Sequence, residues 1–498
     1  MSHFEVIDLF AGPGGLGDGF ASYSNHERFK ILCSVEMDSY ACQTLRGRKA
    51  LLLANEYGDQ KFHDRYLQRL LNGRQKPIGE ELDGSLWNSA TNMVIAAEMG
   101  TSEGNARVDA ALNKLKPHDR RVLIGGPPCQ AYSLVGRARN AGNAKYDPKT
   151  DNRNYLYTEY LRVLNQVKPA VFVMENVKGM NSAKIDGKPI IAQIFQDLAD
   201  PGKAIEGKTS ATYRLYSLTK DLTDLTGETD LNHLDPKDFV IRCEDYGIPQ
   251  ARHRVIIFGV RSDIGKKPEL LVKAPVQKTV RDTIMHLPPL RSGFTDRSLR
   301  NSDFAKTIVK SIQSLSREAS KNPRNGYLAE AYQNQLDKID FSTLKFIQEN
   351  ICFSEHGVAN HFSRKHMLSD LVRYFHAAVW SDLNGVSPKG ENGFPLPSLT
   401  PDHKNWRSGK FNDRFRCQSW DRPSTTIVSH ISKDGHYFIH PDPAQCRSLS
   451  VREAALLQTF PEDYIFEGPQ TAQFHQVGNA VPVELAGQIA KIVEQILN

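Results

Sequence analysis

The sequence predicts an α/β protein whose main domain holds a parallel β-sheet with helices covering both faces. In the first half of the chain, short apolar runs typical of buried strands alternate with helix-compatible stretches. Two of these runs stop at glycine or proline clusters, which end a strand abruptly. Beyond residue 276, Pro, Ser, Asn and basic residues become frequent and the apolar periodicity weakens. This change in composition and periodicity predicts a second, smaller and less regular domain.

The apolar runs define the expected elements and three parts of the chain. The expected strands are Glu5–Phe10, Lys30–Met37, Arg121–Gly125, Ala170–Glu175 and Arg254–Val260. Pro482–Leu497 has apolar residues at helical spacing, so it is expected to pack back on the first domain. We therefore expect a main domain over residues 1–270, a second domain over 271–465 and a closing segment over 466–498. Residues 56–106 are interpreted as a helical insertion with turns in the main domain.

Composition indicates an ordinary soluble protein: 40% of the 498 residues are hydrophobic and 24% are charged. No apolar run is long enough to span a membrane, and the amino terminus lacks the pattern of a secretory signal. The 7 cysteines stand without CxxC spacing, and their odd number argues against a disulfide framework. These features favour a reducing cytoplasm, with no membrane partner and no metal site.

Basic residues are concentrated in the second domain. Residues 276–430 contain 22 Lys plus Arg against 15 Asp plus Glu, an excess of +7, whereas the whole chain carries only +6. A local basic excess suits a phosphate-rich partner, because bound cations release counterions from the phosphates. A solvated surface that happens to be basic would give the same count.

A glycine-rich loop follows the first expected strand. Gly12, Gly14 and Gly17 match the GxGxxG pattern, and Glu36 stands at the end of the next strand. Glycines in such a loop let the backbone approach a ligand, and a carboxylate about 20 residues later accepts hydrogen bonds from ribose hydroxyls. The pattern is typical of dinucleotide enzymes and of enzymes that bind S-adenosylmethionine. By itself it does not separate hydride transfer from methyl transfer, and a glycine-rich turn without a ligand is a third interpretation.

A cysteine follows a proline pair at the end of another expected strand. In Gly125-Gly126-Pro127-Pro128-Cys129-Gln130 the two prolines restrict the backbone just before Cys129. Ligand chemistry gathers at the carboxyl ends of strands in open α/β sheets. A thiolate is intrinsically nucleophilic, and a nearby cation or helix start would lower the pKa of the thiol. Cys129 is therefore a candidate nucleophile, although a single cysteine is more often buried and inert.

Two further motifs carry charge at strand ends. Glu175 ends the strand Ala170–Glu175, and a carboxyl group with a raised pKa could protonate or hydrogen-bond a pyrimidine ring nitrogen. Arg252 and Arg254 alternate along the next expected strand, which sends both side chains to the same side. Two guanidinium groups there suit a phosphate, a carbonyl oxygen or the orientation of Glu175. Rim positions without function are the alternative for all three.

Taken in order, the motifs resemble those of one family, the bacterial DNA cytosine-5 methyltransferases. The matching segments are DLFAGPGG (8–15), Glu36, GGPPCQ (125–130), ENV (175–177), QARHR (250–254), RPSTTI (422–427), SVREAALLQTFPEDY (450–464) and QVGNAVP (476–482). They span almost the whole chain in the order of the family. The resemblance implies a Rossmann-like class I methyltransferase domain, with a target-recognition domain over the basic second region.

The resemblance also implies roles for individual residues. S-adenosyl-L-methionine would be held by Phe10, Ala11, Gly12, Gly14, Gly15, Glu36, Met37, Asp109, Pro128, Asn479 and Val481. Asp109 would approach the adenine amino group, and Asn479 and Val481 would close the cofactor site. Cys129 would attack cytosine, with Glu175, Arg252 and Arg254 as its catalytic partners. The tract 131–154 would form a mobile catalytic loop, with DNA contacts at Gln130, Ser133, Arg137, Arg139 and Gln250.

The expected activity is methyl transfer to carbon 5 of cytosine in double-stranded DNA, with S-adenosyl-L-homocysteine as product. Because the target base is stacked in the duplex, the enzyme must flip it into the site. We expect a monomer, with a cognate restriction endonuclease or other defence proteins as candidate partners. Three alternatives stay open: methylation of transfer RNA, a nicotinamide-dependent oxidoreductase and a non-catalytic protein that binds DNA and cofactor.

Overall fold

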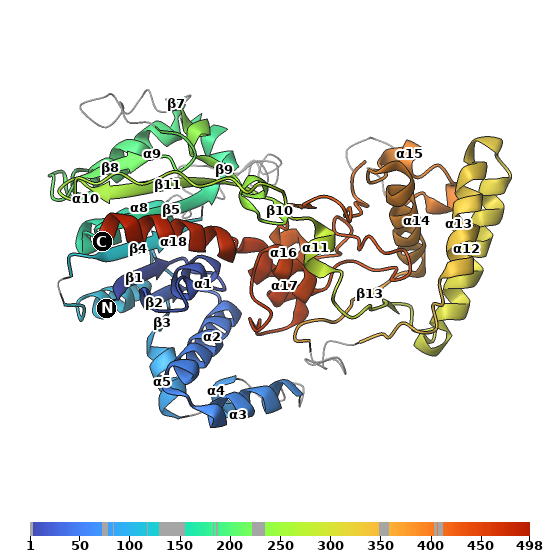
Figure 1. Ribbon diagram of the computed structural model, residues 1–498, viewed down its shortest axis with the longest axis horizontal. Helices are drawn as coiled ribbons and strands as arrows, with labels where there is room; N and C mark the ends of the chain where they lie inside the picture. The colour runs from blue at the N-terminus through green and yellow to red at the C-terminus, as the bar shows by residue number, and fades with distance from the viewer. Residues whose placement is uncertain are drawn as a thin grey trace. The chain divides into compact units, whose positions relative to one another are not determined.

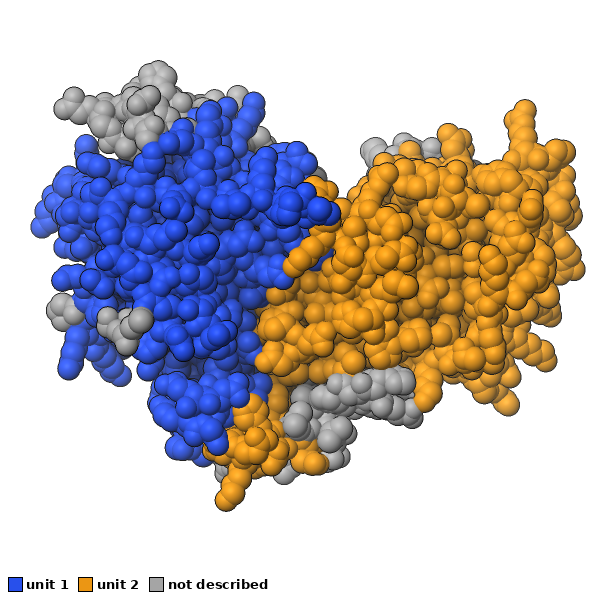
Figure 2. Space-filling model, in the orientation of Figure 1, with its two compact units in different colours: residues 1–58, 83–276, 480–498 blue, residues 59–82, 277–479 orange. Residues whose placement is uncertain are grey.

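The computed structural model describes residues 3–71, 78–82, 84–116, 118–128, 155–182, 184–185, 188–221, 235–347, 358–402, 406 and 412–498. The predictions for Cys129, Gln130, Ser133, Arg137, Arg139 and the loop 131–154 lie outside these residues. The chain divides into two compact units (Figure 2): unit 1 is Met1–Gly58, Asp83–Val276 and Ala480–Asn498, and unit 2 is Asp59–Leu82 and Gln277–Asn479.

Unit 1 is built around an eight-stranded sheet with the order β3-β2-β1-β4-β5-β11-β8, in which β9 also pairs with β11. The strands are β1 (Phe4–Leu9), β2 (Phe29–Glu36), β3 (Val94–Ala96), β4 (Arg121–Gly125), β5 (Val171–Val177), β8 (Tyr213–Tyr216), β9 (Val240–Arg242) and β11 (His253–Arg261). Three short strands lie outside this sheet: β6 (Lys184–Ile185), β7 (Lys188–Pro189) and β10 (Gln250–Ala251).

The sheet is mainly parallel, as expected, but β11 runs against its neighbours. The five strands from β3 to β5 pair in parallel, but β11 runs antiparallel to β5, β8 and β9. An antiparallel strand begins at the edge where its parallel neighbour ends. The start of β11 therefore lies beside the end of β5, and Arg254 is paired in register with Val177.

Helices cover both faces of this sheet, as the sequence predicts (Figure 1). Alternation along β1 sends Val6 to one face and Ile7 to the other, so each strand contributes to two cores. One core packs the sheet against α1 (Gly15–Ser22) and α18 (Val483–Leu497). The other packs it against α6 (Ser102–Leu112), α8 (Tyr155–Val167) and α9 (Ile190–Ala199). The remaining α-helices among the described residues of unit 1 are α2 (Ser39–Tyr57), α5 (Ser85–Asn92) and α10 (Pro201–Glu206).

The carboxyl-terminal helix packs on unit 1, as expected from its apolar spacing. A Cβ added to Gly19 of α1 would stand only 2.4 Å from the Cβ of Ala486 and from the carbonyl oxygen of Val483. Such a close approach requires glycine at this position. The contact holds α1, and with it the glycine loop before α1, against the last helix of the chain.

Unit 2 is mostly helical and irregular. Its helices are α3 (Gln60–Leu71), α4 (Ile78–Glu81), α11 (Val280–Ile284), α12 (Phe304–Ser320), α13 (Gly326–Lys338), α14 (Leu368–Asn384), α15 (Gly390–Gly393), α16 (Val451–Leu457) and α17 (Gln470–Asn479). Its described strands are two residues each: β12 (Gly293–Phe294), β13 (Lys365–His366) and β14 (Ser424–Thr425). An apolar core joins α12, α13 and α14 through residues such as Ile308, Tyr332 and Phe375.

The division into units differs from the expected domain boundaries in two places. The region 56–106 is shared, because residues 59–82 belong to unit 2 while β3 and the start of α6 belong to unit 1. Arg69 of α3 forms a buried ion pair with Glu467, in which Nη1 donates to Oε1 at 2.9 Å and Nη2 donates to Oε2 at 3.0 Å. The return to unit 1 falls at Ala480 rather than at residue 466.

No helix in the described ranges has the length and apolar character needed to cross a bilayer.

Candidate active site

The glycine loop joins β1 to α1 at the carboxyl edge of the sheet. Phe10 and Gly12 have φ angles of 54° and 56°, and Gly14 has a φ of 101° as the residue before α1. Such positive angles favour glycine, and they turn the chain sharply between strand and helix. The amide of Ala11 donates to the carbonyl of Val35 at 3.0 Å, which ties the loop to β2.

Glu36 stands at the end of β2 and holds this loop. Its carboxylate accepts hydrogen bonds from the amides of Gly12 at 2.7 Å, Met37 at 2.9 Å and Asp38 at 2.8 Å. Burial raises the pKa of Glu36 above its ordinary value, and the three amide donors act against that rise. The carboxylate is thus fixed in place beside the loop before any ligand binds.

Space for a ligand is left next to Glu36. Apart from its own chain neighbours, no described residue has an atom within 4 Å of the position that a Cβ on Gly12 would take, and Met37 is 63% exposed. Ala11 and Gly14 of the loop and Gly15 at the start of α1 are buried. An open backbone, a carboxylate and an exposed thioether suit the ribose and base of a nucleoside.

The carboxyl-terminal residues assigned to the cofactor site differ in their surroundings. Val481 is buried in the same core as Leu16 of α1, so it supports the helix that follows the glycine loop. Asn479, the last residue of α17, is exposed and its Nδ2 lies 3.3 Å from Nδ1 of His475. Val481 therefore acts on the loop through packing, and Asn479 presents its amide group to solvent.

A carboxylate and a guanidinium meet where β5 ends and β11 begins. Nε of Arg254 lies 2.7 Å from Oε1 of Glu175, and both side chains are largely buried. This pairing depends on the antiparallel direction of β11, which brings Arg254 to the carboxyl edge. Nη1 of Arg254 donates to the carbonyl of His253 at 2.8 Å, so the guanidinium is oriented from two sides.

The turn after β4 lies against the same carboxylate. A Cβ added to Gly126 would stand 2.8 Å from Oε2 of Glu175, so glycine is needed for this approach. Nδ2 of Asn176 donates to the carbonyl of Pro127 at 3.1 Å and anchors the proline pair to β5. Pro128 is the last described residue before Cys129. Gly126 and Pro127 are therefore held against Glu175 and Asn176 at the end of β5.

Arg252 and Gln250 are both enclosed by protein. The side chain of Arg252 is 1% exposed, and burial together with the neighbouring Arg254 lowers the pKa of Arg252 to about 9. Arg252 thus stays charged at neutral pH and adds a positive potential next to Glu175. Gln250 is fully buried. The contact of Gln250 with DNA therefore stays a prediction, and the burial of this side chain lends it no support.

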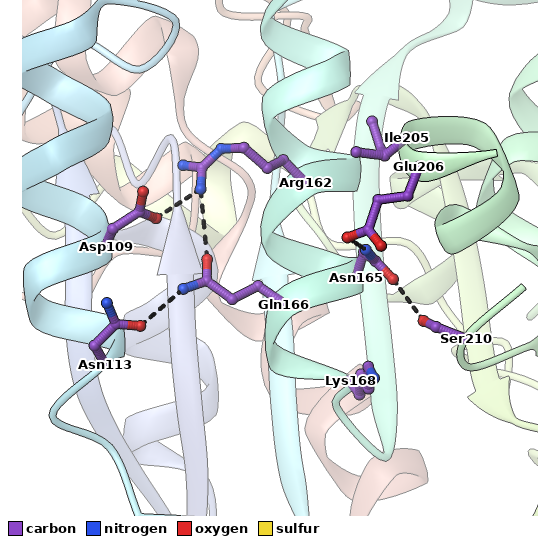
Figure 3. Close-up of a pocket in the computed structure, with 9 residues that line it drawn as sticks. All are labelled: Asp109, Asn113, Arg162, Asn165, Gln166, Lys168, Ile205, Glu206 and Ser210. Carbon is purple, nitrogen blue, oxygen red and sulfur yellow. Dashed lines mark hydrogen bonds and ion pairs between the residues drawn. The ribbon is translucent and has the colours of Figure 1, made fainter. Parts of the chain in front are cut away.

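Asp109 does not lie at the carboxyl edge, contrary to the expectation that it approaches adenine. It stands two turns into α6, and its Oδ1 lies 2.6 Å from Nη1 of Arg162 on α8. Figure 3 shows this pair at one side of a polar cavity of about 460 Å³, with the bond between Asn165 and Glu206 at the other. The cavity also borders Lys168, which precedes β5, so it belongs to the edge where the parallel strands begin.

Glu98 is the acidic residue that sequence reasoning missed. It follows β3, and the amide of Ala97 before it donates to the carbonyl of Glu36 at 2.9 Å. Glu98 is exposed and stands one strand beyond Glu36 at the edge that carries the glycine loop. In the sequence, the pattern that points to Glu98 is an acidic residue directly after the short apolar run Val94–Ala97. It was hidden because the run is too short to be distinguished from the helical stretches around it.

Fold and site together define a Rossmann-like protein with a nucleoside-type loop and a charged pair on one sheet edge. The family model described as "C-5 cytosine-specific DNA methylase" matches residues 96–206 and 235–495, well over half of the chain. The chain belongs to this family. The protein is thus a DNA cytosine-5 methyltransferase, and its reaction requires a methyl donor.

Similar proteins cover the chain from end to end. The type II methyltransferase M.Bpa9945I from Bacillus paralicheniformis is 32% identical over 522 residues, which include 99% of each chain. The type II methyltransferase M.AgeI from Thalassovita gelatinovora is 28% identical and covers 98% of this chain and 99% of its own. A solved prophage-encoded E. coli protein, designated a DNA modification methyltransferase, gives a TM-score of 0.52 with 19% identity, covering 99% of each chain. The similarity to this solved structure shows that the two proteins share a fold.

Proposed function

We propose that this protein transfers a methyl group from S-adenosyl-L-methionine to carbon 5 of a cytosine in double-stranded DNA, with Cys129 as nucleophile. The observation that carries the proposal is the pair of Glu175 and Arg254, set against Gly126 on the edge that also holds the glycine loop. A carboxylate fixed by a guanidinium, beside the turn whose sequence continues to Cys129 and on the same sheet edge as a nucleoside loop, has the groups needed to activate a pyrimidine ring.

The residues around Glu36 fit the proposed donor. The glycine loop would lie under the sulfonium and its adenosine, Glu36 would accept from the ribose, and Glu98 would reach the base from the next strand. This assignment gives Glu98 the role that the sequence suggested for Asp109. S-adenosyl-L-methionine supplies a methyl group on a positively charged sulfur and leaves as S-adenosyl-L-homocysteine. No metal takes part in the proposal.

The chain's own groups activate the cytosine, which must first leave the stacked duplex. The thiolate of Cys129 adds to C6 of the ring, and Glu175 stabilises the charge that develops at N3. Arg254 and the buried charge of Arg252 hold Glu175 in orientation. Addition at C6 makes C5 nucleophilic. After C5 is methylated, its proton passes to solvent, the electron pair of the C5–H bond restores the C5–C6 double bond, and the bond between C6 and Cys129 breaks to release the thiolate.

Unit 2 is the proposed target-recognition domain. It contains the basic excess of residues 276–430, which suits the phosphates of a duplex. The similar type II methyltransferases support a role in restriction and modification, with a cognate endonuclease as the partner. We propose that the enzyme acts as a cytoplasmic monomer that marks its host DNA.

Incubation with tritiated S-adenosyl-L-methionine and mixed duplex DNA tests this proposal. Label is expected in cytosine of the DNA, and label in transfer RNA alone would move the activity to RNA. Cys129→Ala is expected to abolish transfer while S-adenosyl-L-methionine still binds with unchanged affinity in a calorimeter. A Cys129→Ala protein that still methylates DNA would remove this residue from the mechanism.

A further inference from the structure

One face of helix α12 in unit 2 has a row of uncompensated positive charge. Lys306, Lys310, Gln313 and Arg317 recur at intervals of four, three and four residues, and all four are exposed. At 100° per residue these positions fall within a narrow arc of the helix. Lys321 and Arg324, also exposed, extend the row into the following turn. We call Lys306, Lys310, Arg317, Lys321 and Arg324 the α12 basic stripe.

The stripe lies opposite the buried side of the same helix. Phe304, Ile308, Ile312, Leu315 and Ala319 pack into the core of unit 2. Because the apolar residues hold one side of α12 against that core, the stripe necessarily faces outward. The single acid within residues 304–325 is Glu318, whose Oε1 accepts from the amide of Ser398 at 3.1 Å. No exposed acid lies between Lys306 and Arg324, although the exposed Asp303 precedes the stripe at the start of α12.

Many other cations of unit 2 form ion pairs with acidic side chains, and the stripe differs from them in the part of the chain that the structure describes. Described ion pairs join Arg281 to Asp421, Arg373 to Asp370, Arg414 to Asp434, Arg416 to Asp413 and Arg447 to Glu453. Within the described residues, no acidic side chain forms an ion pair with the stripe. The neighbouring helix α13 presents Glu330, Asp337 and Lys338 to solvent, so the charge is segregated on α12. A solvated surface of ordinary composition would mix both signs.

We infer that the α12 basic stripe binds the phosphate backbone of the DNA that the enzyme methylates, independently of base sequence. The inference rests on the proposed function for the identity of the substrate. The 17 residues of α12 span about 25 Å, enough to follow several phosphates along a duplex. The exposed side chains of the stripe face are Lys, Arg, Gln, Ser and Asn, all of which donate to phosphate oxygens. No large apolar side chain is exposed on α12, which argues against a protein partner.

The test is the salt dependence of DNA binding by the triple variant Lys306→Gln, Lys310→Gln, Arg317→Gln. Each lost phosphate contact lowers the slope of log affinity against log salt by about 0.9, so three lower it by about 2.7. Between 50 and 200 mM salt, wild type should then lose about 40-fold more affinity than the variant, measured by fluorescence anisotropy on a random duplex of about 30 base pairs. The matched control is Lys203→Gln, Lys208→Gln, Lys266→Gln, which removes the same charge from exposed lysines of unit 1.

The control should keep the wild-type slope, and both variants should keep the wild-type melting temperature. A stripe variant with the wild-type slope, or a control that loses as much slope, would overturn the inference. A loss of binding to transfer RNA but not to duplex DNA would also overturn it. Methyl transfer to mixed duplex DNA by the wild type is measured in parallel. If the wild type transfers no methyl group to DNA, the proposed function is contradicted. If the wild type transfers methyl groups normally but the stripe variant keeps the wild-type salt slope, only the inference about the stripe is contradicted.

Discussion

The contact between Gly126 and Glu175 makes a sharp prediction for Gly126→Ala. The added Cβ would stand 2.8 Å from Oε2 of Glu175, whereas ordinary contacts begin at 3.4 Å, so the carboxylate must retreat by about 0.6 Å. This displacement of the carboxylate strains its ion pair with Arg254, in which Nε of Arg254 lies 2.7 Å from Oε1 of Glu175. Overpacking of this kind costs about 1–3 kcal/mol, and 1.36 kcal/mol corresponds to tenfold in rate. If the cost falls on the transition state, methyl transfer slows by about 5- to 150-fold.

Single-turnover transfer of a tritiated methyl group to duplex DNA measures this loss. The affinity for S-adenosyl-L-methionine should stay unchanged, because the substitution lies outside the glycine loop. The matched control is Gly326→Ala at the start of α13, where no described residue outside the adjoining backbone has an atom within 4 Å of the added Cβ. It should transfer methyl at the wild-type rate.

A double-mutant cycle separates the clash from a general disturbance of the turn. In a Glu175→Asp background the carboxylate is one methylene shorter, so the added methyl group has less to displace. Gly126→Ala should then cost much less than in the wild type, which makes the two substitutions non-additive. An equal cost in both backgrounds would refute the reasoning, as would a wild-type rate for Gly126→Ala itself.

Three further predictions concern stability. Burial lowers the pKa of His361 and His376 to about 4 and that of His366 to about 3. Their stabilising contribution is present above pH 6.5 and is lost as the pH falls toward these values, by roughly 2 kcal/mol each at pH 5. Arg69→Met leaves Glu467 buried without its partner and should destabilise the fold by about 3–5 kcal/mol. Gly19→Ala forces α1 away from α18 and should cost about 1–3 kcal/mol or more.

Urea titrations measure all three. A free energy of unfolding that is equal at pH 7 and pH 5 would contradict the neutral, buried state of the histidines. The double variant Arg69→Met, Glu467→Leu should recover much of the loss from Arg69→Met, because no charge stays buried. Failure to recover would mean that Arg69 contributes through packing. A Gly19→Ala protein as stable as the wild type would show that α18 shifts freely on α1.

The sequence was sufficient for the local features of unit 1. Apolar runs with glycine or proline at their ends identified β1, β2, β4, β5 and β11, because burial on both faces leaves a continuous apolar signature. It missed β3, β8 and β9, since three- and four-residue strands carry too few side chains for a period to emerge. The family match bears out the reaction class read from the motifs.

Tertiary structure decided where those features meet. Whether β11 runs with or against β5 depends on the path of the intervening chain, and only the antiparallel direction brings Arg254 to Glu175. The acid at the loop edge is Glu98 rather than Asp109, because α6 leads Asp109 away toward Arg162. The sequence by itself thus determined the motifs and the chemistry they suggest. Long-range packing determined which side chains share an edge, because burial and strand direction depend on residues far apart in the chain.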